Sequence, residues 1–251
     1  MRLLSLFITL MVVVTARAAD DYAAATFTGP GGVLLYRILS PTKIDSGVSY
    51  PLVIFLHGAG ERGDDSASQL RHGGTLFSNP GNRAKNPAFV IFPQCPNGKR
   101  WVEVEWGDAN PHQQPKEPSD PMESVIELVP SLIESLPVDP SRVYVMGISM
   151  GGFGTWDLAA RHPEWFAAAV PICGGADNST APLLAKMPVW TFHGDKDPTI
   201  HVERTRSMVE ALKKAGGSPK YTEFPGIPHN SWDSAFADPG LLPWLFAQKR
   251  P

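Results

Sequence analysis

One serine-centred stretch, residues 143–154, constrains the fold of this chain more than any other feature. It reads Val-Tyr-Val-Met-Gly-Ile-Ser-Met-Gly-Gly-Phe-Gly, so an apolar run ends in Gly-x-Ser-x-Gly and passes directly into a helix-like segment. A strand that turns sharply into a helix presents its serine above the end of a parallel sheet, an arrangement called a nucleophile elbow. We therefore predict that Ser149 is a nucleophile, and that a base and an acid follow it in the chain.

The two glycines that flank this serine have a predicted steric role. Gly147 and Gly151 lie two residues before and after Ser149. The serine backbone must be strained in such a turn, and side chains at the flanking positions would collide where strand and helix cross. We expect only glycine to fit at both positions.

Apolar runs bounded by turn residues alternate with helical patterns along the whole chain. Candidate strands cover residues 24–28, 33–39, 52–56, 89–92, 142–147, 167–172, 189–192 and 220–224. Such alternation predicts a mostly parallel eight-stranded sheet with helices on both faces. No helix separates the first two strands, so we expect them to form an antiparallel N-terminal edge. The length fits a single α/β catalytic domain over residues 19–251.

The helical patterns lie between the later strands. They cover residues 121–136, 151–161, 201–215 and 240–249, and Asp120 is the predicted cap of the first. Residues 93–120 form the least regular region, rich in proline and polar residues. A loop of this length predicts a lid or a binding loop, or else a poorly ordered segment.

The N-terminus has the pattern of a targeting segment. Arg2 is followed by an apolar run, and Ala16-Arg17-Ala18 fits a cleavage site for a secretory signal peptide. We expect residues 1–18 to be removed and the mature protein to be secreted or periplasmic. An uncleaved anchor is the alternative, although the apolar run is short for a bilayer.

Composition limits the classes of partner. The net charge is −3, with 43% hydrophobic and 19% charged residues. This balance argues against nucleic acid or a membrane surface as a partner. No cysteine, histidine or carboxylate grouping has metal-ligand spacing, so we expect no metal and no other cofactor.

An acid and a base follow the serine in the order Ser, Asp, His. Asp195 and Asp197 come directly after a predicted strand, and His229 lies in a later loop. In such a triad His229 would take the serine proton, and the acid would hold the correct histidine tautomer. The acid must reach over the sheet, which favours Asp197, and Asp195 is then a turn-forming or supporting residue.

The remaining histidines have weaker claims to a catalytic role. His57 directly follows a strand, and we interpret it as a structural histidine in a tight turn; His193 is similar. The other four, which we expect to be exposed, are His72, His112, His162 and His201.

The predicted oxyanion hole consists of two backbone N–H groups. One belongs to Met150, the residue after the nucleophile, and the other to Ala59, with Gly60 as the alternative. Small residues after the strand that ends at Leu56 would let the backbone approach a substrate.

These segments resemble the α/β-hydrolase superfamily over nearly the whole mature chain. The motifs are His-Gly-Ala-Gly-Glu-Arg-Gly at 57–63, Pro-Gln-Cys-Pro at 93–96, the serine motif at 147–156, Pro-Ile-Cys-Gly-Gly at 171–175 and His-Gly-Asp-Lys-Asp at 193–197. They are similar to small secreted carboxylesterases related to feruloyl and acetylxylan esterases, polyhydroxybutyrate depolymerases and prolyl-oligopeptidase-like hydrolases. The resemblance implies Ser149, Asp197 and His229 as the triad, and Ala59 and Met150 as the oxyanion donors.

The strand order of that superfamily bears on the two cysteines. Cys95 and Cys173 both follow predicted strands, which would be about 14 Å apart at the usual strand spacing. A direct disulfide cannot span this distance, although loops could close it. A disulfide and a pair of buried thiols both remain open.

The expected substrate is an ester, either small or linked to a polysaccharide. Trp101, Trp106 and Trp232 are candidates to line the entrance, because aromatic faces suit a sugar ring or a phenolic acyl group. The alternative is that they pack loops onto the core. A serine carboxylesterase acting on feruloyl or acetyl esters is the leading hypothesis. A secreted serine peptidase is the second, and a catalytically dead binding protein is the third.

Overall fold

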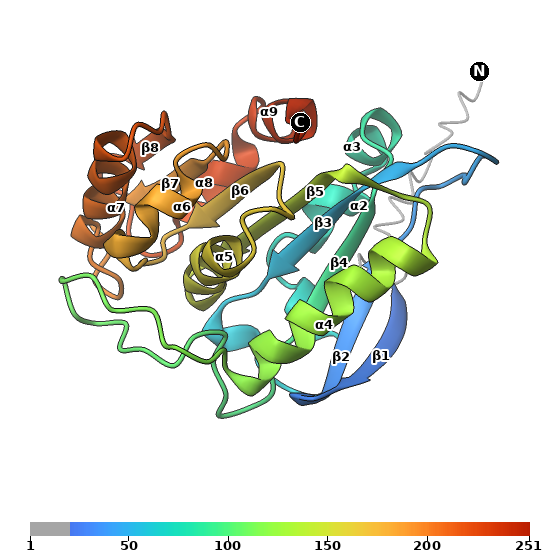
Figure 1. Ribbon diagram of the computed structural model, residues 1–251, viewed down its shortest axis with the longest axis horizontal. Coiled ribbons are helices and arrows are strands. Elements are labelled where there is room, and N and C mark those ends of the chain that lie inside the picture. Colours follow the sequence, from blue (N-terminus) through green and yellow to red (C-terminus); the bar gives the residue numbers. More distant parts are fainter. Residues whose placement is uncertain (1–20) are drawn as a thin grey trace, which may run out of the picture.

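A computed structural model describes residues 21–251, so the predicted leader at 1–18 lies outside the described residues. Eight strands form one twisted sheet in the order β1-β2-β4-β3-β5-β6-β7-β8 (Figure 1). The strands are β1 (Ala23–Gly29), β2 (Gly32–Leu39), β3 (Tyr50–Leu56), β4 (Phe89–Gln94), β5 (Val138–Ile148), β6 (Ala168–Ile172), β7 (Trp190–Gly194) and β8 (Lys220–Phe224).

The direction of the strands confirms the predicted sheet. β1 pairs with β2 and β2 with β4 in antiparallel register, whereas every pair from β4 to β8 is parallel. Parallel strands end at the same edge, so the loops after β3, β5 and β7 meet there. This edge collects the residues that the sequence singled out.

Helices cover both faces of the sheet and enclose two apolar cores. The first core contains side chains of α4 (Asp120–Ser135), α5 (Met150–Arg161), α6 (Ala181–Leu184) and α7 (Glu203–Lys214). The second contains side chains of α2 (Gly74–Ser78), α8 (Ser231–Ala237) and α9 (Leu241–Ala247). Figure 1 shows α4 and α5 together in front of the sheet, with α9 on the opposite side.

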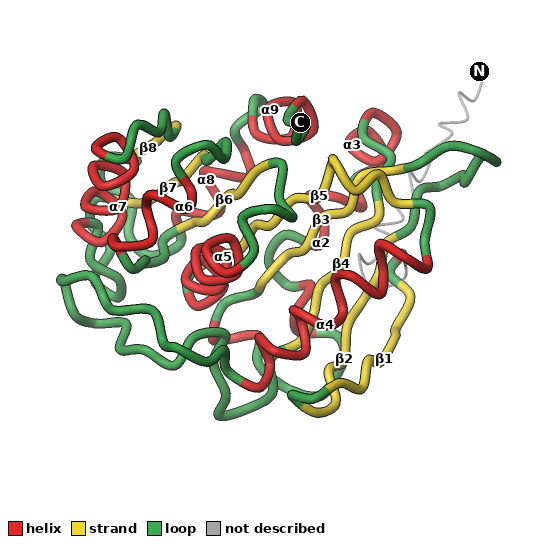
Figure 2. The backbone as a smooth tube through the Cα atoms, in the orientation of Figure 1, coloured by secondary structure: helices red, strands yellow, loops and turns green. Residues whose placement is uncertain are grey.

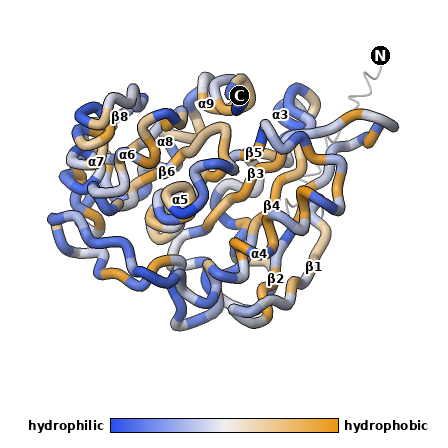
Figure 3. The backbone as a smooth tube through the Cα atoms, in the orientation of Figure 1, coloured by the Kyte–Doolittle hydropathy of each residue, from blue (hydrophilic) through white to orange (hydrophobic). Residues whose placement is uncertain are grey.

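Alternating side chains of the central strand β3 supply both cores. Leu52 and Ile54 are fully buried in the first core, and Val53 and Phe55 are fully buried in the second. A strand buried on both faces reads as a continuous apolar run, which explains why β3 was clear in the sequence. Figure 3 shows hydrophobic residues concentrated on these central strands.

The largest error in the predicted strands concerns the start of β5. The strand begins at Val138, whereas the sequence placed its start at residue 142. Val138 pairs with Tyr50 before a shift in register, and Ser141 N–H bonds to the Asp139 carboxylate. This local turn chemistry looks like a loop in the sequence, but pairing with β3 keeps the segment in the sheet.

The predicted cap of α4 is also wrong. Ser119 is the N-cap residue, and its side chain accepts a hydrogen bond from Met122 N–H. Asp120 is the first helical residue and pairs instead with Lys99 at 2.7 Å. A carboxylate in the first turn remains favourable for the helix dipole.

Several short helices were not predicted at all. They are α2, α6, α8 and α3 (Pro80–Lys85). Each has four to seven residues, which is too short for a clear periodic pattern. Tertiary packing holds them, because helices of this length are marginal in isolation.

Both cysteines are buried and free. Two strands, β3 and β5, separate the strands that precede them. The sulfurs are therefore held apart by the sheet itself, in agreement with the alternative of two buried thiols. Among residues 21–251, no helix combines the length and the apolarity needed to cross a membrane.

Candidate active site

Ser149 lies in the sharp turn between β5 and α5. Its backbone has φ 53° and ψ −118°, a conformation that L-residues rarely adopt. A Cβ at Gly147 would lie 2.4 Å from Gly151 O, and one at Gly151 would lie 1.9 Å from Leu56 O. Both glycines are therefore required by contacts with backbone, which confirms the predicted steric role.

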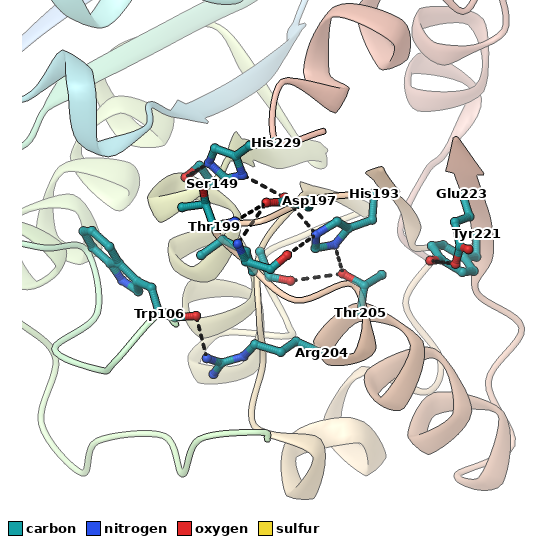
Figure 4. A network of polar contacts seen from close by, with 12 residues as sticks. Trp106, Ser149, His193, Asp197, Thr199, Arg204, Thr205, Tyr221, Glu223 and His229 are labelled. Carbon is teal, nitrogen blue, oxygen red and sulfur yellow. Dashed lines mark hydrogen bonds and ion pairs between the residues drawn. The ribbon is translucent and has the colours of Figure 1, made fainter. Parts of the chain in front are cut away.

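Asp197, His229 and Ser149 form a continuous chain of hydrogen bonds (Figure 4). His229 Nδ1 lies 2.7 Å from Asp197 Oδ2, and His229 Nε2 lies 2.8 Å from Ser149 Oγ. An ionised carboxylate can only accept, so Nδ1 carries the hydrogen and Nε2 is free to accept from the serine hydroxyl. The structure thus brings together three residues that are up to 80 positions apart.

Asp197 is the more strongly held of the two candidate acids. Its side chain is fully buried, and its Oδ1 accepts hydrogen bonds from Thr199 N–H and Ile200 N–H at 2.8 and 2.9 Å. Burial by itself would raise the pKa of this carboxyl. Hydrogen bonds from His193, His229 and Ile200 N–H outweigh burial and hold the pKa far below its usual value.

Asp195 lies outside this network. Its Oδ1 accepts a hydrogen bond from Gly226 N–H at 2.6 Å, which ties the turn after β7 to the turn after β8. This contact agrees with the predicted turn-forming role.

Two helix starts carry the predicted oxyanion donors: α5 directly follows the serine, and the other start follows Gly58, which lies against Ile148, the residue before the serine. Met150 is the first residue of α5, and Ala59 is the first residue of a short 3-10 helix, Ala59–Glu61. The first N–H groups of a helix have no partner within it, so both are free to bind an anionic oxygen.

His57 supports the loop that contains Ala59. The side chain has no exposed surface; Nε2 accepts from Cys95 N–H at 2.9 Å and Nδ1 donates to Gly58 O at 2.6 Å. Burial lowers the pKa of His57 to about 4, so the ring is neutral at ordinary pH. This geometry matches the predicted structural role.

His193 has a contact that the sequence did not predict. Its ring is fully buried, and Nε2 lies 3.1 Å from Asp197 Oδ2, so the carboxylate has two histidine partners. The only sequence signal was the spacing of four residues between His193 and Asp197, which alone does not indicate contact in a loop.

The expectation that His112 is exposed is wrong. Its Nδ1 accepts from Arg204 Nη2 at 2.7 Å, and its ring stacks on Phe153. Burial, and secondarily the Arg204 charge, lowers the pKa of His112 to about 4. Tertiary contact, invisible in the sequence, leaves this histidine only partly exposed, and the same expectation fails for His72 and His162, which are also partly buried, but holds for His201.

The irregular segment 95–119 is fastened to the domain at several points (Figure 2 shows it as a long loop). Arg204 donates to the backbone oxygens of Glu105, Trp106 and Asp108. Further along, Arg161 donates to Pro115 O. Whether the loop moves as a lid stays a prediction, but its middle is tied to α7 and its later part to α5.

The three candidate tryptophans lie in different surroundings. Trp101 has no exposed surface and donates to His57 O at 3.0 Å, so it packs the loop onto the core and does not line an entrance. Trp106 is partly exposed beneath the Arg100 guanidinium, 4.5 Å from the ring centre. Trp232 is also partly exposed, with its ring edge-to-face against His229 at 5.3 Å.

One group of potential metal ligands occurs in the described residues. Cys173, Asp197 and His229 each have a ligand atom within 4.8 Å of the others. Asp197 and His229 are already bonded to each other. Complete burial raises the pKa of the Cys173 thiol well above its usual value, which disfavours the thiolate that metal binding needs. The donors present do not fit a metal centre well.

Comparison with known proteins supports the fold. A solved structure of a thermostable esterase is 37% identical, with a TM-score of 0.86, over 93% of this chain and 64% of that one. Poly(3-hydroxyalkanoate) depolymerase C of Paucimonas lemoignei is 30% identical over 68% of this chain and 38% of its own length. Feruloyl esterase B of Thermothelomyces thermophilus is 28% identical over 87% of this chain and 83% of its own.

The chain therefore spans less than two thirds of the depolymerase and of the solved esterase. The likeness nevertheless confirms the α/β-hydrolase fold that the sequence motifs predicted. The family model for Phospholipase/Carboxylesterase matches residues 44–238, which contain the serine, the aspartate and the histidine described above. The chain belongs to the phospholipase/carboxylesterase family of α/β-hydrolases.

Proposed function

We propose that this protein is a serine carboxylesterase in which Ser149 is the nucleophile, His229 the base and Asp197 the orienting acid. The observation that carries the proposal is the unbroken contact chain from Asp197 through His229 to the Ser149 hydroxyl, at 2.7 and 2.8 Å. These contacts meet at the end of β5, where the strained serine directly precedes the first N–H groups of α5.

The proposed reaction begins when Ser149 Oγ attacks the ester carbonyl carbon while His229 Nε2 takes the hydroxyl proton. The N–H groups of Ala59 and Met150 bind the oxyanion that forms. His229 then gives the proton to the leaving alcohol oxygen, the C–O bond breaks, and an acyl-serine remains. Water then attacks the acyl-serine carbonyl while His229 takes its proton. The bond from the acyl carbon to Oγ breaks, His229 returns the proton to Ser149 Oγ, and the carboxylic acid leaves.

The electrostatics suit this sequence of proton transfers. Asp197 stays ionised because its hydrogen bonds keep its pKa low. It therefore stabilises the imidazolium that forms when His229 takes the serine proton. His229 is partly exposed, with 23% of its side chain accessible, so the proposed base can reach a bound substrate.

Feruloyl or acetyl esters of plant polysaccharides are the proposed substrate class. Support comes from the similarity to a feruloyl esterase, and from two partly exposed tryptophans, Trp106 and Trp232. Trp232 packs on the proposed base itself. Aromatic faces of this kind stack well on phenolic or sugar rings. The apolar N-terminal segment supports a secreted or periplasmic location.

Hydrolysis assays on matched substrates test the proposal. The purified protein is expected to hydrolyse p-nitrophenyl acetate and methyl ferulate, and to leave a panel of peptide p-nitroanilides nearly untouched. A fluorophosphonate probe should label the wild type on Ser149. Peptide amides cleaved faster than esters would favour the peptidase alternative. A wild type that neither turns over esters nor reacts with the probe would instead indicate a binding protein.

A further inference from the structure

His193 makes a second histidine contact with the carboxylate of Asp197. The ring comes from the end of β7, and Figure 4 shows it on the opposite side of Asp197 from His229. Both histidines approach the same oxygen, Oδ2, at 3.1 Å for His193 Nε2 and 2.7 Å for His229 Nδ1. The two backbone donors of the loop bind the other oxygen, Oδ1.

The surroundings of His193 fix which ring nitrogen carries the hydrogen. Nε2 faces two groups that can only accept, namely Asp197 Oδ2 and, at 3.0 Å, Ile200 O. Nε2 must therefore be protonated. Nδ1 lies 2.7 Å from Thr205 Oγ1, whose hydroxyl can donate to it. The longer contact from Thr205 Oγ1 to Gly174 O, at 3.1 Å, is the weaker one.

The contacts of His193 join three parts of the fold. Thr205, on α7, fixes the ring from one side, and the ring itself has no exposed surface. From the other side, Nε2–H reaches both the Asp197 carboxylate and the Ile200 carbonyl. The turn between Asp197 and Ile200 is thus closed at both ends by one buried imidazole. Rotation of the Asp197 side chain would break at least one of these bonds.

We propose that His193 is a positioning residue, whose Nε2–H aims Oδ2 of Asp197 at His229 and holds His229 in line with Ser149. The inference rests on the proposed function, because it assigns a role relative to that triad. His193 does not touch substrate and exchanges no proton in the reaction. It acts only through the orientation of the carboxylate, and Thr205 supports it from α7.

Two substitutions of His193 separate positioning from packing. Gln places an amide N–H near the position of Nε2, whereas Leu fills similar space without a donor. His193→Leu is expected to lower kcat for p-nitrophenyl acetate by about 10- to 100-fold, the usual effect of losing an orienting partner of a functional group. KM should stay within about twofold, because no substrate contact is lost. His193→Gln should recover most of the lost kcat.

Two substitutions of Thr205, which bonds to His193, provide a second matched pair of variants. Thr205→Val removes the hydroxyl at nearly constant shape, and Thr205→Ser keeps it. The valine variant should lose kcat in the same direction as His193→Leu but by less, and the serine variant should resemble the wild type. Equal kcat in the leucine and glutamine variants would overturn the proposal, as would a loss confined to KM.

A proton NMR spectrum of the resting enzyme gives a readout that needs no turnover. The His229 Nδ1–H bonded to Asp197 should give a resonance far downfield in the wild type. In His193→Leu this resonance should move or broaden, while in His193→Gln it should return. An unchanged resonance in the leucine variant would contradict the proposal. A wild type without esterase activity would instead contradict the proposed function, whatever the spectra of the variants.

Discussion

Two His-Gly pairs end parallel strands at the same edge of the sheet, and they use the histidine differently. His57-Gly58 follows β3, and His193-Gly194 ends β7. Both rings are fully buried. His57 bonds only to main chain, at Gly58 O and Cys95 N. His193 bonds to two side chains, those of Asp197 and Thr205, as well as to Ile200 O.

The difference follows from what each loop supplies. After β3 the proposed functional group is the N–H of Ala59, so the histidine must fix a stretch of backbone. After β7 it is the carboxylate of Asp197, so the histidine must fix a side chain. The same dipeptide therefore supports the proposed oxyanion hole on one side of Ser149 and the proposed acid on the other. Its role depends on the partner that the next loop brings within reach.

Ser149→Ala removes the residue that the loops after β3 and β7 both serve in the proposed site. The largest loss of kcat is therefore expected here. Loss of the nucleophile should lower kcat by about 10⁶-fold, as in other serine triads. The melting temperature should change little, because alanine fits the same space. Ester hydrolysis and thermal unfolding of the same preparation measure both. Retention of more than a few per cent of activity would remove Ser149 from the proposed mechanism.

Asp197→Asn tests the loop after β7 and should cause the second largest loss of kcat. An amide in this position favours the wrong tautomer of His229, and kcat should fall by about 10⁴-fold. The neighbouring Asp195→Asn is the matched control, since it changes only the contact to Gly226 N–H. Its kcat should stay within about twofold of the wild type. A greater loss for Asp195→Asn would assign the acid to that residue.

His57→Asn tests the loop after β3 and should lower kcat less than Asp197→Asn does. It keeps a donor for Gly58 O but leaves Cys95 N–H without an acceptor, which costs about 1–3 kcal/mol in stability. Slackening of the Ala59 loop should lower kcat by about 10- to 100-fold, less than the full loss of an oxyanion donor. Chemical denaturation and kcat separate the two effects. A kcat loss as large as that of Asp197→Asn would contradict the smaller role assigned to the loop after β3.

As the pH falls, the contribution of His57, after β3, to stability should be lost before that of Asp197, after β7. The pKa of His57 is about 4 in the fold against 6.5 as its ordinary value, so the unfolded chain binds more protons between these limits. Stability is therefore lost as pH falls from about 6.5 to about 4, by at most about 3 kcal/mol. Asp197 has a lowered pKa, so its contribution is lost only below its usual value of 3.8.

Urea denaturation between pH 4.5 and 7 measures this slope. His57→Asn should make the slope of stability against pH shallower. The slope that remains should come from His112, whose pKa is also lowered to about 4. His112→Asn provides the comparison variant on the long loop. An unchanged slope in both variants would show that other groups set the acid stability.

Some parts of the site were predictable because short-range sequence patterns encode them. Gly147 and Gly151 are fixed by the crossing of β5, α5 and Leu56 O, and glycine is the only residue type without a Cβ to clash. Ser149, Asp197 and His229 each follow a recognisable strand in the expected order. The strand ends therefore located the candidate residues, and the parallel sheet brought them to one edge.

Other parts were not predictable because their partners are distant in the sequence. Arg204 and His112 are 92 positions apart, and nothing local to either indicates a buried contact. Trp101 looked like an entrance residue from its irregular loop, yet it packs beneath His57. Composition indicates that a loop is polar, but only packing decides which of its aromatic residues turn inward.

The amino-acid sequence by itself determined the strand-turn-helix around Ser149, the parallel sheet and the order of serine, acid and base. These follow from backbone sterics and from apolar periodicity, which act over a few residues. Only the tertiary structure decided that His193 contacts Asp197, that His57 bonds to backbone, and that Arg204 fastens the long loop. Hydrogen-bond partners depend on ångström-scale distances between separate elements, and those distances exist only once the chain has packed.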